Sequence, residues 1–434
     1  MRVGFIILGM LLFCSAAATN FYLSNSGNDA WIGTNHQAPW QTLSKLQSVI
    51  PHLKAGDSIL LKRGDYFFGQ LDFESIASAS SCIYLGAYGI GENPVISGFA
   101  NSIDWEPTLI ATLWKANIKI PSTNYPIVVN NHRLVDRGRY PDTGYITYQL
   151  VKAINNTITV PQFLGNKNWE GADFMMRKEH WIFDASKVIT QQGNQFILQP
   201  PKTENYYAGK DGFGLFVQNH LATLNLKDEW KYDFSSKQFI IKTLGASPKK
   251  QLRIGVLDYL LNIHQTQYLT IENLQFEGAN GYGILLTESG HIQLRKCSFK
   301  WLGLAAIQAN HCNDLQIEGN QFEQLPNNGI KLECLSKANF VIKENQFQQI
   351  AMIAGLQASG DGNGKAIFVA GNHTLISKNN LDSLGYIGIE FQGNNVLIDQ
   401  NVIQNFCMVK DDGGAIYTWL HWGHQQFKNR TIKD

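Results

Sequence analysis

The sequence has no excess of charge of either sign. Its 434 residues include 36 Lys plus Arg and 35 Asp plus Glu, so the formal net charge is +1. Proteins that bind nucleic acid or anionic membranes through their surface normally carry a basic excess. We therefore expect neither of these partners.

Cysteines are few, and they are not spaced as a disulfide framework. The chain has six, and five of them lie beyond the first twenty residues: Cys82, Cys297, Cys312, Cys334 and Cys407. An odd, scattered set does not predict paired cysteines, and no Cys/His spacing is typical of zinc. We predict no metal ligand among them and expect Cys297 to be a buried apolar filler.

Long apolar runs are also missing, apart from one at the start. Arg2 precedes an apolar stretch at 3–13, and small residues follow at 15–18. This pattern predicts a signal peptide at 1–18 and a secreted or periplasmic protein. The apolar run is too short to span a bilayer easily. Cys14 follows a bulky Phe, which disfavours lipoprotein processing.

Helical periodicity is absent from residues 269–419, which instead repeat six times. The cores of the first strand of each repeat are Ile271, Leu294, Ile317, Ile342, Ile376 and Ile398. Three residues later come Leu274, Cys297, Asn320, Asn345, Asn379 and Asn401, here called the ladder positions. Apolar residues follow two positions further on, at Phe276, Phe299, Phe322, Phe347, Leu381 and Ile403. Steps of 23, 23, 25, 34 and 22 residues are typical of a solenoid.

A second short strand in each repeat begins with a small residue and an Ile. The pairs are Gly283-Ile284, Ala306-Ile307, Gly329-Ile330, Ala366-Ile367, Gly388-Ile389 and Ala415-Ile416. Two strands of period two per repeat, separated by Gly and Asn, predict a parallel β-helix. We expect the ladder Asn residues to adopt the left-handed backbone of a tight bend and to hydrogen-bond along the stack.

The N-terminal residues 19–100 are predicted to hold the first coils and a cap. Leu43, Leu46, Val49 and Ile50 have helical spacing, which predicts an amphipathic helix at 41–50. The open end of a β-helix exposes apolar rungs and unpaired strand edges, so we expect this helix to cover it.

The run from Tyr22 to Leu71, with Asn93 to Gly98, resembles the opening of secreted right-handed parallel β-helix proteins that act on polysaccharides. With the repeats, the resemblance covers about half of the chain. It implies the fold but leaves the reaction open, because lyases, hydrolases and esterases share it.

Residues 101–260 do not repeat, and their alternating strands predict an inserted antiparallel β domain. Two landmarks lie there, Asn131–Pro141 and Glu229–Asp233. Together with the segment Asp411–Trp419 they resemble a glycosidase-type subgroup of β-helix proteins, with glycoside hydrolase family 141 the nearest.

The predicted fold class is therefore all-β: a right-handed parallel β-helix with an N-terminal helical cap and an inserted antiparallel β domain. The repeats occupy 261–434. Arg430 begins a seventh strand whose ladder position would be residue 435, so we expect a truncated chain. A native terminus that frays is the alternative.

Strand alternation lays out two outward-facing columns. The first column is Leu285, Gln308, Lys331, Phe368, Glu390 and Tyr417. The second column is Thr287, Asn310, Glu333, Ala370, Gln392 and Trp419. Charges and aromatics gather from the third coil onward, which predicts a sugar-binding groove on the later coils.

The predicted catalytic residues are Asp411, Asp412 and Glu390. Adjacent coils are ~4.8 Å apart, which places Asp411 or Asp412 roughly 5–10 Å from Glu390. Glycoside hydrolysis needs two carboxyl groups, one to protonate the leaving oxygen and one to act as base or nucleophile. The alternatives are a plain Asp-Asp-Gly-Gly turn and a solvated Glu390.

The residues predicted to bind substrate are Lys331, Glu333, Asp361, Lys365, Tyr417, Trp419, His421 and Arg139. Alternatively, Lys331 and Glu333 form a surface ion pair that contributes little to stability. The aromatic residues alternatively pack against further coils, and Arg139 braces the insert. Asp361 with Asn363 is a weak signal for calcium, and we predict no cofactor otherwise.

Three functions remain open at this point. The first is a glycoside hydrolase that acts on a polysaccharide or oligosaccharide as a monomer. The second is a polysaccharide lyase, whose base would come from Lys331, Lys365, His421 or His424. The third is a carbohydrate-binding or adhesive protein without catalysis.

Overall fold

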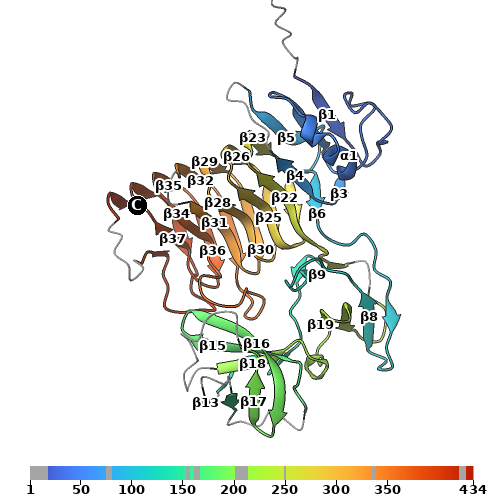
Figure 1. Cartoon of the computed structure of the whole chain (residues 1–434), viewed down its shortest axis with the longest axis vertical. Coiled ribbons are helices and arrows are strands. Elements are labelled where there is room, and N and C mark those ends of the chain that lie inside the picture. The colour runs from blue at the N-terminus through green and yellow to red at the C-terminus, as the bar shows by residue number, and fades with distance from the viewer. Residues whose placement is uncertain are drawn as a thin grey trace, which may run out of the picture.

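The computed structural model describes residues 18–74, 81–147, 149–152, 157–160, 167–200, 214–248, 251–334, 338–419 and 427–433. The predicted signal peptide, except Ala18, and His421 and His424 lie outside these residues. The described chain is almost entirely β-structure, with one α-helix and two 3-10 turns (Figure 1). No helix in these ranges is long and apolar enough to cross a membrane.

Three long parallel sheets form the solenoid. The first sheet runs in the order β1 (Asn20–Leu23), β2 (Ser58–Lys62), β5 (Ile83–Tyr88), β23 (Gln267–Glu272), β26 (Gly290–Arg295), β29 (Asn313–Glu318), β32 (Phe340–Lys343), β35 (Thr374–Ser377), β38 (Val396–Asp399) and β41 (Arg430–Lys433). The second sheet consists of β4 (Leu71–Glu74), β22 (Leu257–His264), β25 (Ala279–Thr287), β28 (Ala305–Asn310), β31 (Asn328–Cys334), β34 (Ile367–Gly371), β37 (Ile389–Gln392) and β40 (Ile416–Tyr417). The third sheet consists of β3 (Tyr66–Phe68), β6 (Val95–Ser97), β24 (Gln275–Glu277), β27 (Ser298–Lys300), β30 (Gln321–Leu325), β33 (Gln346–Ile350), β36 (Asn380–Leu384) and β39 (Val402–Gln404).

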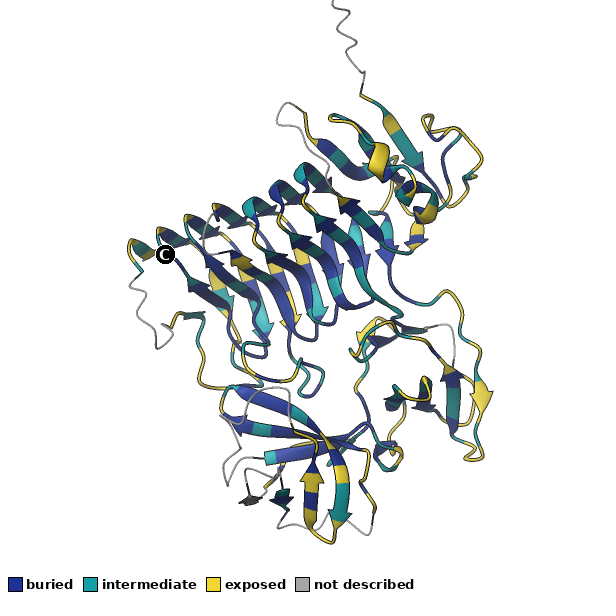
Figure 2. Ribbon diagram, viewed as in Figure 1, coloured by how far each residue is buried: buried dark blue, intermediate teal, exposed yellow. Residues whose placement is uncertain are grey.

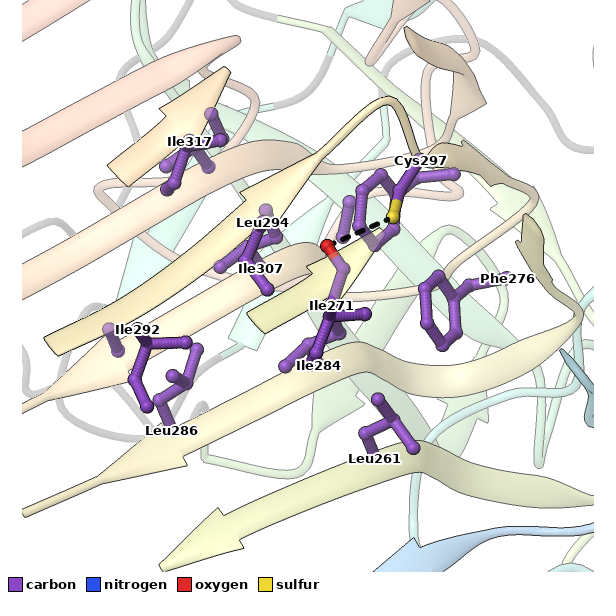
Figure 3. Packing of buried hydrophobic residues seen from close by; sticks show 14 of the residues in the cluster. Leu261, Ile271, Phe276, Ile284, Leu286, Ile292, Leu294, Cys297, Ile307 and Ile317 are labelled. Carbon is purple, nitrogen blue, oxygen red and sulfur yellow. Dashed lines mark hydrogen bonds between the residues drawn. The ribbon is translucent and has the colours of Figure 1, made fainter. Parts of the chain in front are cut away.

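The register of the coils confirms that the predicted first-strand cores stack in one column. Ile271 pairs with Leu294, which pairs with Ile317, and the same column continues through Ile342 to Ile398. All of these side chains belong to one continuous apolar core (Figure 3). The sequence analysis expected two strands per coil, but each coil has three. The apolar follower residues, such as Phe276, lie on the third strand.

The third sheet contributes a column of stacked rings to the core. Phe276, Phe299, Phe322 and Phe347 lie one above another with ring centroids 5.2, 5.0 and 4.5 Å apart, and their planes are within 14° of parallel. All four are buried. Such pairs stabilise by about 0.5–1.5 kcal/mol beyond the area they bury.

A ladder of buried Asn side chains connects the coils by hydrogen bonds at the bend between the first and third sheets. The Asn345 Oδ1 atom accepts from the Asn320 backbone N–H at 2.9 Å and from the Asn320 Nδ2 at 3.0 Å. Asn345 in turn donates to the Ile317 carbonyl and to Asn379 Oδ1, both at 2.9 Å. Asn379 and Asn401 repeat the pattern.

The prediction that the ladder Asn residues are themselves left-handed is wrong. The left-handed residue is the one just before each ladder position, as at Lys296, Gly319 and Glu344, with φ of 50°, 65° and 58°. The bend is thus made one residue earlier. The Asn that follows is free to point inward, where its amide satisfies backbone groups of neighbouring coils.

The small residues that begin the strands of the second sheet are required by the neighbouring coil. A Cβ atom at Gly329 would lie 2.4 Å from the Ala366 carbonyl oxygen, and one at Gly388 would lie 2.5 Å from that of Ala415. Both contacts are shorter than side chains tolerate. The Gly-Ile and Ala-Ile pairs are therefore a packing constraint at the point where each coil enters this sheet.

The predicted N-terminal helix is present but shorter than 41–50. It consists of α1 (Leu43–Gln47) and a 3-10 turn, η1 (Ile50–His52). Thr42 caps α1 through its side chain. Leu43, Leu46 and Ile50 are buried in the solenoid core, and Gln47 exchanges two hydrogen bonds with the backbone of Asp72 on β4. The cap therefore covers the first coil with apolar side chains.

An insertion between β6 and β22 forms three antiparallel sheets. One contains β9 (Val128–Asn130), β10 (Arg133–Leu134) and β21 (Leu252–Ile254). The second contains β7 (Glu106–Pro107), β8 (Leu113–Asn117), β19 (Trp230–Asp233) and β20 (Gln238–Lys242). The third contains β11 (Arg139–Tyr140), β12 (Ile146–Thr147), β13 (Gln149–Lys152), β14 (Thr157–Thr159), β15 (Asp173–Glu179), β16 (Ile182–Gln192), β17 (Gln195–Leu198) and β18 (Gly214–Gln218).

The solenoid is continuous across this insertion. Strands β4, β5 and β6 pair directly with β22, β23 and β24. The landmark residues Trp230 and Tyr232 are buried in the insert's own apolar core, so their role is structural. Figure 2 shows the buried interior of the solenoid and the separate buried centres of the insert.

The insert docks against the long connection of the fourth coil. Gly360 forms a backbone bridge with Phe183 on β16, with an N···O distance of 2.8 Å. The Ser359 hydroxyl donates to Asp184 at 2.8 Å. Arg137 donates to the carbonyl of Gly355. These contacts hold the third insert sheet beside the later coils of the solenoid (Figure 1).

We predict that Asn345→Ala lowers the free energy of unfolding by about 2–4 kcal/mol, because several buried polar groups lose their partners. Urea denaturation followed by circular dichroism measures the change. Gln348→Ala is the control, since Gln348 lies exposed in the same coil and should change stability little. Equal effects of the two substitutions would contradict a structural role for the ladder.

Candidate active site

Three consecutive connections lead from the third sheet into the second at the C-terminal coils. They span 351–366, 385–388 and 405–415. Backbone bonds tie them together, since Gly385 donates to the Ile350 carbonyl and accepts from the Val409 and Lys410 amides. A Cβ at Gly385 would lie 1.9 Å from the Ala351 carbonyl, so only Gly allows this approach. The three connections form one edge of the solenoid.

Glu390 lies on β37 in the column that the sequence predicted. It pairs in register with Phe368 on one side and Tyr417 on the other. Its carboxylate is not solvated, because only 2% of the residue is exposed. Glu390 Oε2 lies 2.6 Å from the Nζ atom of Lys365, which is also buried. A buried carboxylate held by such a short contact is rigidly placed.

Lys410 is a second buried cation at this edge, and the sequence analysis did not identify it. Its Nζ atom donates to the Asn363 carbonyl at 2.9 Å and lies 5.3 Å from the centre of the Tyr386 ring. Burial lowers the pKa of Lys410 to about 7, against the opposing effect of Asp361, and Lys365 lowers it further. The only signal in the sequence was its place directly before Asp411-Asp412.

Three carboxylates act electrostatically on two tyrosines at this edge. Burial raises the pKa of Tyr386, and Tyr417, Asp361, Glu390 and Asp412 raise it further. Burial likewise raises the pKa of Tyr417, followed by Asp412, Glu390 and Asp361. The three carboxylates come from three successive coils, and each acts on both phenols. Asp361 and Asp412 are exposed, whereas Glu390 is buried.

Asp411 and Asp412 are neighbours in sequence, but their contacts differ. Asp411 forms an ion pair with Arg177 and a contact of 3.1 Å with His180 Nδ1, both on or beside β15 of the insert. Asp412 has a left-handed backbone, with φ of 60°, and its carbonyl accepts from the Tyr386 hydroxyl at 3.1 Å. The structure thus places Asp411 in the insert contact and leaves Asp412 near Tyr417.

The remaining predicted residues divide into two groups. Asp361, Lys365 and Tyr417 belong to the cluster just described. Trp419 lies two residues beyond Tyr417 and is 40% exposed.

Three predicted residues lie apart from this cluster. Lys331 pairs with Glu333 at 3.1 Å on β31, earlier in the solenoid. Arg139 donates to the carbonyls of Pro141 and Gly144 and stacks on Phe216, with its Cζ atom 3.7 Å from the ring centre. Arg139 therefore braces the insert instead of lining the cluster.

Calcium binding stays a prediction from the sequence. Asp361 Oδ1 accepts from the Gly362 amide at 2.6 Å, and the Asn363 amide donates to carbonyls within its own loop. Within the described ranges, no three His, Cys, Asp or Glu side chains are grouped so that they could hold a metal ion.

Comparison with known proteins agrees with this architecture. The family described as right handed beta helix region matches residues 259–351. A solved glycoside hydrolase superposes over 96% of both chains with a TM-score of 0.60 and 11% identity. The chain has the right-handed parallel β-helix fold. This confirms the resemblance drawn from the sequence at the level of the fold, while the narrower likeness to glycoside hydrolase family 141 stays a prediction.

Two further relatives are similar over part of their length. A lacto-N-biosidase of Bifidobacterium longum subsp. longum is 36% identical over 98 residues, which is 21% of this chain and 6% of that protein. The matched stretch is thus a small part of that relative. XylC in complex with xylose superposes over 92% of this chain and 68% of its own, with 12% identity and a TM-score of 0.48.

We predict that Lys410 makes stability depend on pH between about 7 and its ordinary pKa of 10.5. In this window the unfolded chain binds a proton at Lys410 that the folded chain does not, so raising the pH favours folding. The stability of the wild type should therefore rise relative to Lys410→Met as the pH increases. Lys428→Met, at an exposed position, is the control. Parallel stability–pH curves for the wild type and Lys410→Met would contradict the depressed pKa.

Proposed function

We propose that this protein is a carbohydrate-active enzyme that hydrolyses glycosidic bonds at the edge formed by its last three coils. The observation that carries the proposal is the place of Glu390, which lies beside Tyr417 on the second sheet, with Asp361 and Asp412 on the connections that enter the neighbouring strands of that sheet on either side. Most glycoside hydrolases use a pair of carboxyl groups. We also propose secretion, on the basis of residues 1–18.

The surroundings of the carboxyl groups suggest separate roles. Glu390 is held in place by its 2.6 Å contact with Lys365, and we assign it the role of nucleophile or general base. Asp412 is exposed and forms no ion pair with any residue that the structure describes, so the leaving oxygen of a substrate can reach it, and we assign it the role of protonating that oxygen. Asp361 lies exposed one coil before Glu390, where it can bind hydroxyl groups of the sugar.

Asp411 contributes indirectly in this proposal. Its contacts with Arg177 and His180 fix the third connection against the insert, and its own backbone amide donates to the His180 carbonyl at 3.2 Å. The adjacent Asp412 is thereby held in a left-handed conformation that few residues adopt readily. We therefore treat Asp411 as a positioning residue and Asp412 as a catalytic residue.

The exposed indole of Trp419 supports a saccharide ligand. It lies two residues beyond Tyr417 and is 40% exposed, and aromatic rings with one apolar and one wet side are suited to packing against sugar rings. The partial likeness to a lacto-N-biosidase is in line with hydrolysis of a glycosidic bond.

A polysaccharide lyase is the second candidate, and one observation favours it. Lys410, with its pKa near 7, has the basicity that proton abstraction from a uronate requires. However, Lys410 is 1% exposed and its amine is bound to the Asn363 carbonyl, so it would have to become accessible before it could react, as would the similarly buried Glu390. The exposed carboxylates are better placed for chemistry.

The reaction type is tested with a panel of plant and algal polysaccharides and oligosaccharides. We expect new reducing ends without absorbance from unsaturated uronate. Formation of unsaturated product would show that the protein is a lyase and not a hydrolase. The absence of both signals across the panel would leave carbohydrate binding without catalysis.

We predict that Asp412→Asn lowers kcat about 100-fold or more, the usual effect of losing a general acid. Asp411→Asn is the matched control, because it alters the adjacent residue and should reduce kcat by much less. Full activity of Asp412→Asn would rule out the assigned role.

The second carboxyl group is tested separately. Glu390→Gln should lower kcat by a similar factor, but it leaves Lys365 buried without a counter-ion, which costs about 3–5 kcal/mol of stability. Thermal unfolding must therefore accompany the kinetic measurement. Asp361→Asn should mainly raise KM. If Glu390→Gln is folded and fully active, the pair is wrongly assigned.

A further inference from the structure

Two buried cysteines meet where neighbouring coils leave the second sheet. Cys312 lies two residues beyond β28 and Cys334 ends β31, and these strands are parallel neighbours with Asn310 opposite Glu333. The Cys312 backbone N–H donates to the Cys334 Sγ atom at 3.1 Å. Adjacent coils are about 4.8 Å apart, within the separation of roughly 4.4–6.8 Å between the Cα atoms of a disulfide. The fold therefore brings together two cysteines that stand 22 positions apart in sequence.

The two thiols also contact each other. The hydrogen bond between them raises the pKa of Cys312 and lowers the pKa of Cys334. Cys334 is therefore the thiol that loses its proton first. A thiolate is the form that attacks a disulfide, so the pair holds both a nucleophile and a second thiol within its reach.

The thiols occupy positions that the two preceding coils fill with hydroxyl groups. The Thr266 backbone N–H donates to the Ser289 Oγ atom at 3.1 Å, as the Cys312 backbone N–H does to Cys334. The Ser289 hydroxyl donates to a backbone carbonyl at 2.9 Å, whereas the Cys312 and Cys334 sulfur atoms lie 3.3 and 3.6 Å from theirs. A thiol is the weaker donor, so hydrogen bonding gives two cysteines no advantage over hydroxyl groups at this bend.

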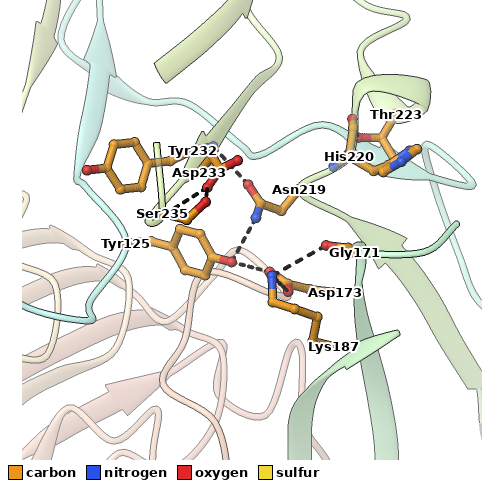
Figure 4. Close-up of polar contacts among 10 residues, drawn as sticks. All are labelled: Tyr125, Gly171, Asp173, Lys187, Asn219, His220, Thr223, Tyr232, Asp233 and Ser235. Atoms are coloured by element: carbon orange, nitrogen blue, oxygen red, sulfur yellow. Dashed lines mark hydrogen bonds and ion pairs between the residues drawn. The ribbon is translucent and has the colours of Figure 1, made fainter. Parts of the chain in front are cut away.

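Buried polar groups in the insert are held by stronger partners. The Tyr125 hydroxyl donates to Asp173 and accepts from Asn219 at 2.8 Å, and Lys187 lies 3.6 Å from the same carboxylate (Figure 4). Charge-assisted hydrogen bonds of this kind complete such a cluster without a covalent link. The two thiols contact backbone groups and each other, so the bond that they can still form is the one between their sulfur atoms.

We propose that Cys312 and Cys334 form a disulfide that joins β28 to β31 when the chain folds in an oxidising compartment. The oxidant is a small disulfide of the glutathione type. The Cys334 thiolate attacks one of its sulfur atoms and releases the first glutathione thiol, and the Cys312 sulfur then attacks Cys334 and releases the second. Two thiol hydrogens leave the protein, two electrons reduce the oxidant, and one sulfur–sulfur bond forms.

Both cysteines are buried in the folded chain, with exposed fractions of 2% and 3%, so the reaction precedes the final stacking of these coils. The bond closes a loop whose ends are 22 positions apart, which lowers the entropy of the unfolded chain and favours the folded solenoid. It also fastens β31, which lies two strands from β37 in the same sheet. The proposal concerns the scaffold alone and does not depend on the proposed hydrolysis.

Peptide mapping of the whole protein tests the bond. The protein is produced in the periplasm and, separately, in the cytoplasm of a bacterial host, and each preparation is unfolded, alkylated with iodoacetamide and digested with trypsin without reduction. Trypsin cuts after Lys300, Lys331 and Lys337, so the two cysteines fall in separate peptides, 301–331 and 332–337. We expect the two peptides to be linked in the periplasmic protein and to separate after reduction by dithiothreitol.

Cys297 is the internal control, because it is as deeply buried and lies in its own tryptic peptide, 297–300. It should be alkylated in both preparations. Complete alkylation of Cys312 and Cys334 in the periplasmic protein, or linkage of either to another cysteine, overturns the proposal.

Variants separate the disulfide from the bend itself. Cys334→Ser supplies the hydroxyl that Ser289 supplies in an earlier coil, so the fold should persist. The melting temperature of the wild type should be roughly 5 °C higher in the periplasmic preparation than in the cytoplasmic one, while Cys334→Ser should melt alike in both. Cys82→Ser, at an exposed cysteine, should keep the wild-type difference. A difference that persists in Cys334→Ser, or none in the wild type, contradicts the assignment, and the proposed hydrolysis is judged by its own kinetic test.

Discussion

The structure depends on one constraint: every coil must satisfy its backbone and its apolar face against the next coil. In a single coil of three short strands neither is possible, so stability comes from stacking. The Asn ladder expresses this constraint most sharply, because each amide bonds to backbone and side-chain groups of neighbouring coils. The small Gly and Ala residues at the strand starts reflect the same constraint, because the backbone of the next coil leaves little room for a larger side chain. Repetition of these residues is therefore a physical requirement.

The same stacking positions the candidate active site. Side chains at equivalent places in successive coils are held about 4.8 Å apart, so groups that are 20 or more residues apart in sequence become neighbours. Asp361, Glu390 and Asp412 are brought together in this way. The insert packs against the connections that carry the candidate site and fixes them from outside the solenoid. Arg177 and His180 contact Asp411, and β16 pairs with Gly360.

The extent to which sequence predicted the structure follows from these interactions. Columns such as Glu390 beside Tyr417 were predictable, because alternation and period fix the register. The third strand was missed because the left-handed residue that separates it, for instance Lys296 or Glu344, has no characteristic type. Lys410 and Tyr386 were missed since loops carry no period. The partners of Asp411 lie some 230 residues away in the insert, a contact that no local pattern encodes.

The insertion between β6 and β22 also has a consequence for how the chain acquires its fold. Strands on either side of it are direct hydrogen-bonded neighbours, although their paired residues, such as Val95 and Gln275, are 180 positions apart in sequence. Closing so long a loop costs entropy that only grows slowly with its length. The later coils contact their neighbours locally and are free to assemble first. The early coils, with their helix, would then pack onto the end of the coils that have already folded. The order of assembly therefore need not follow the order of synthesis.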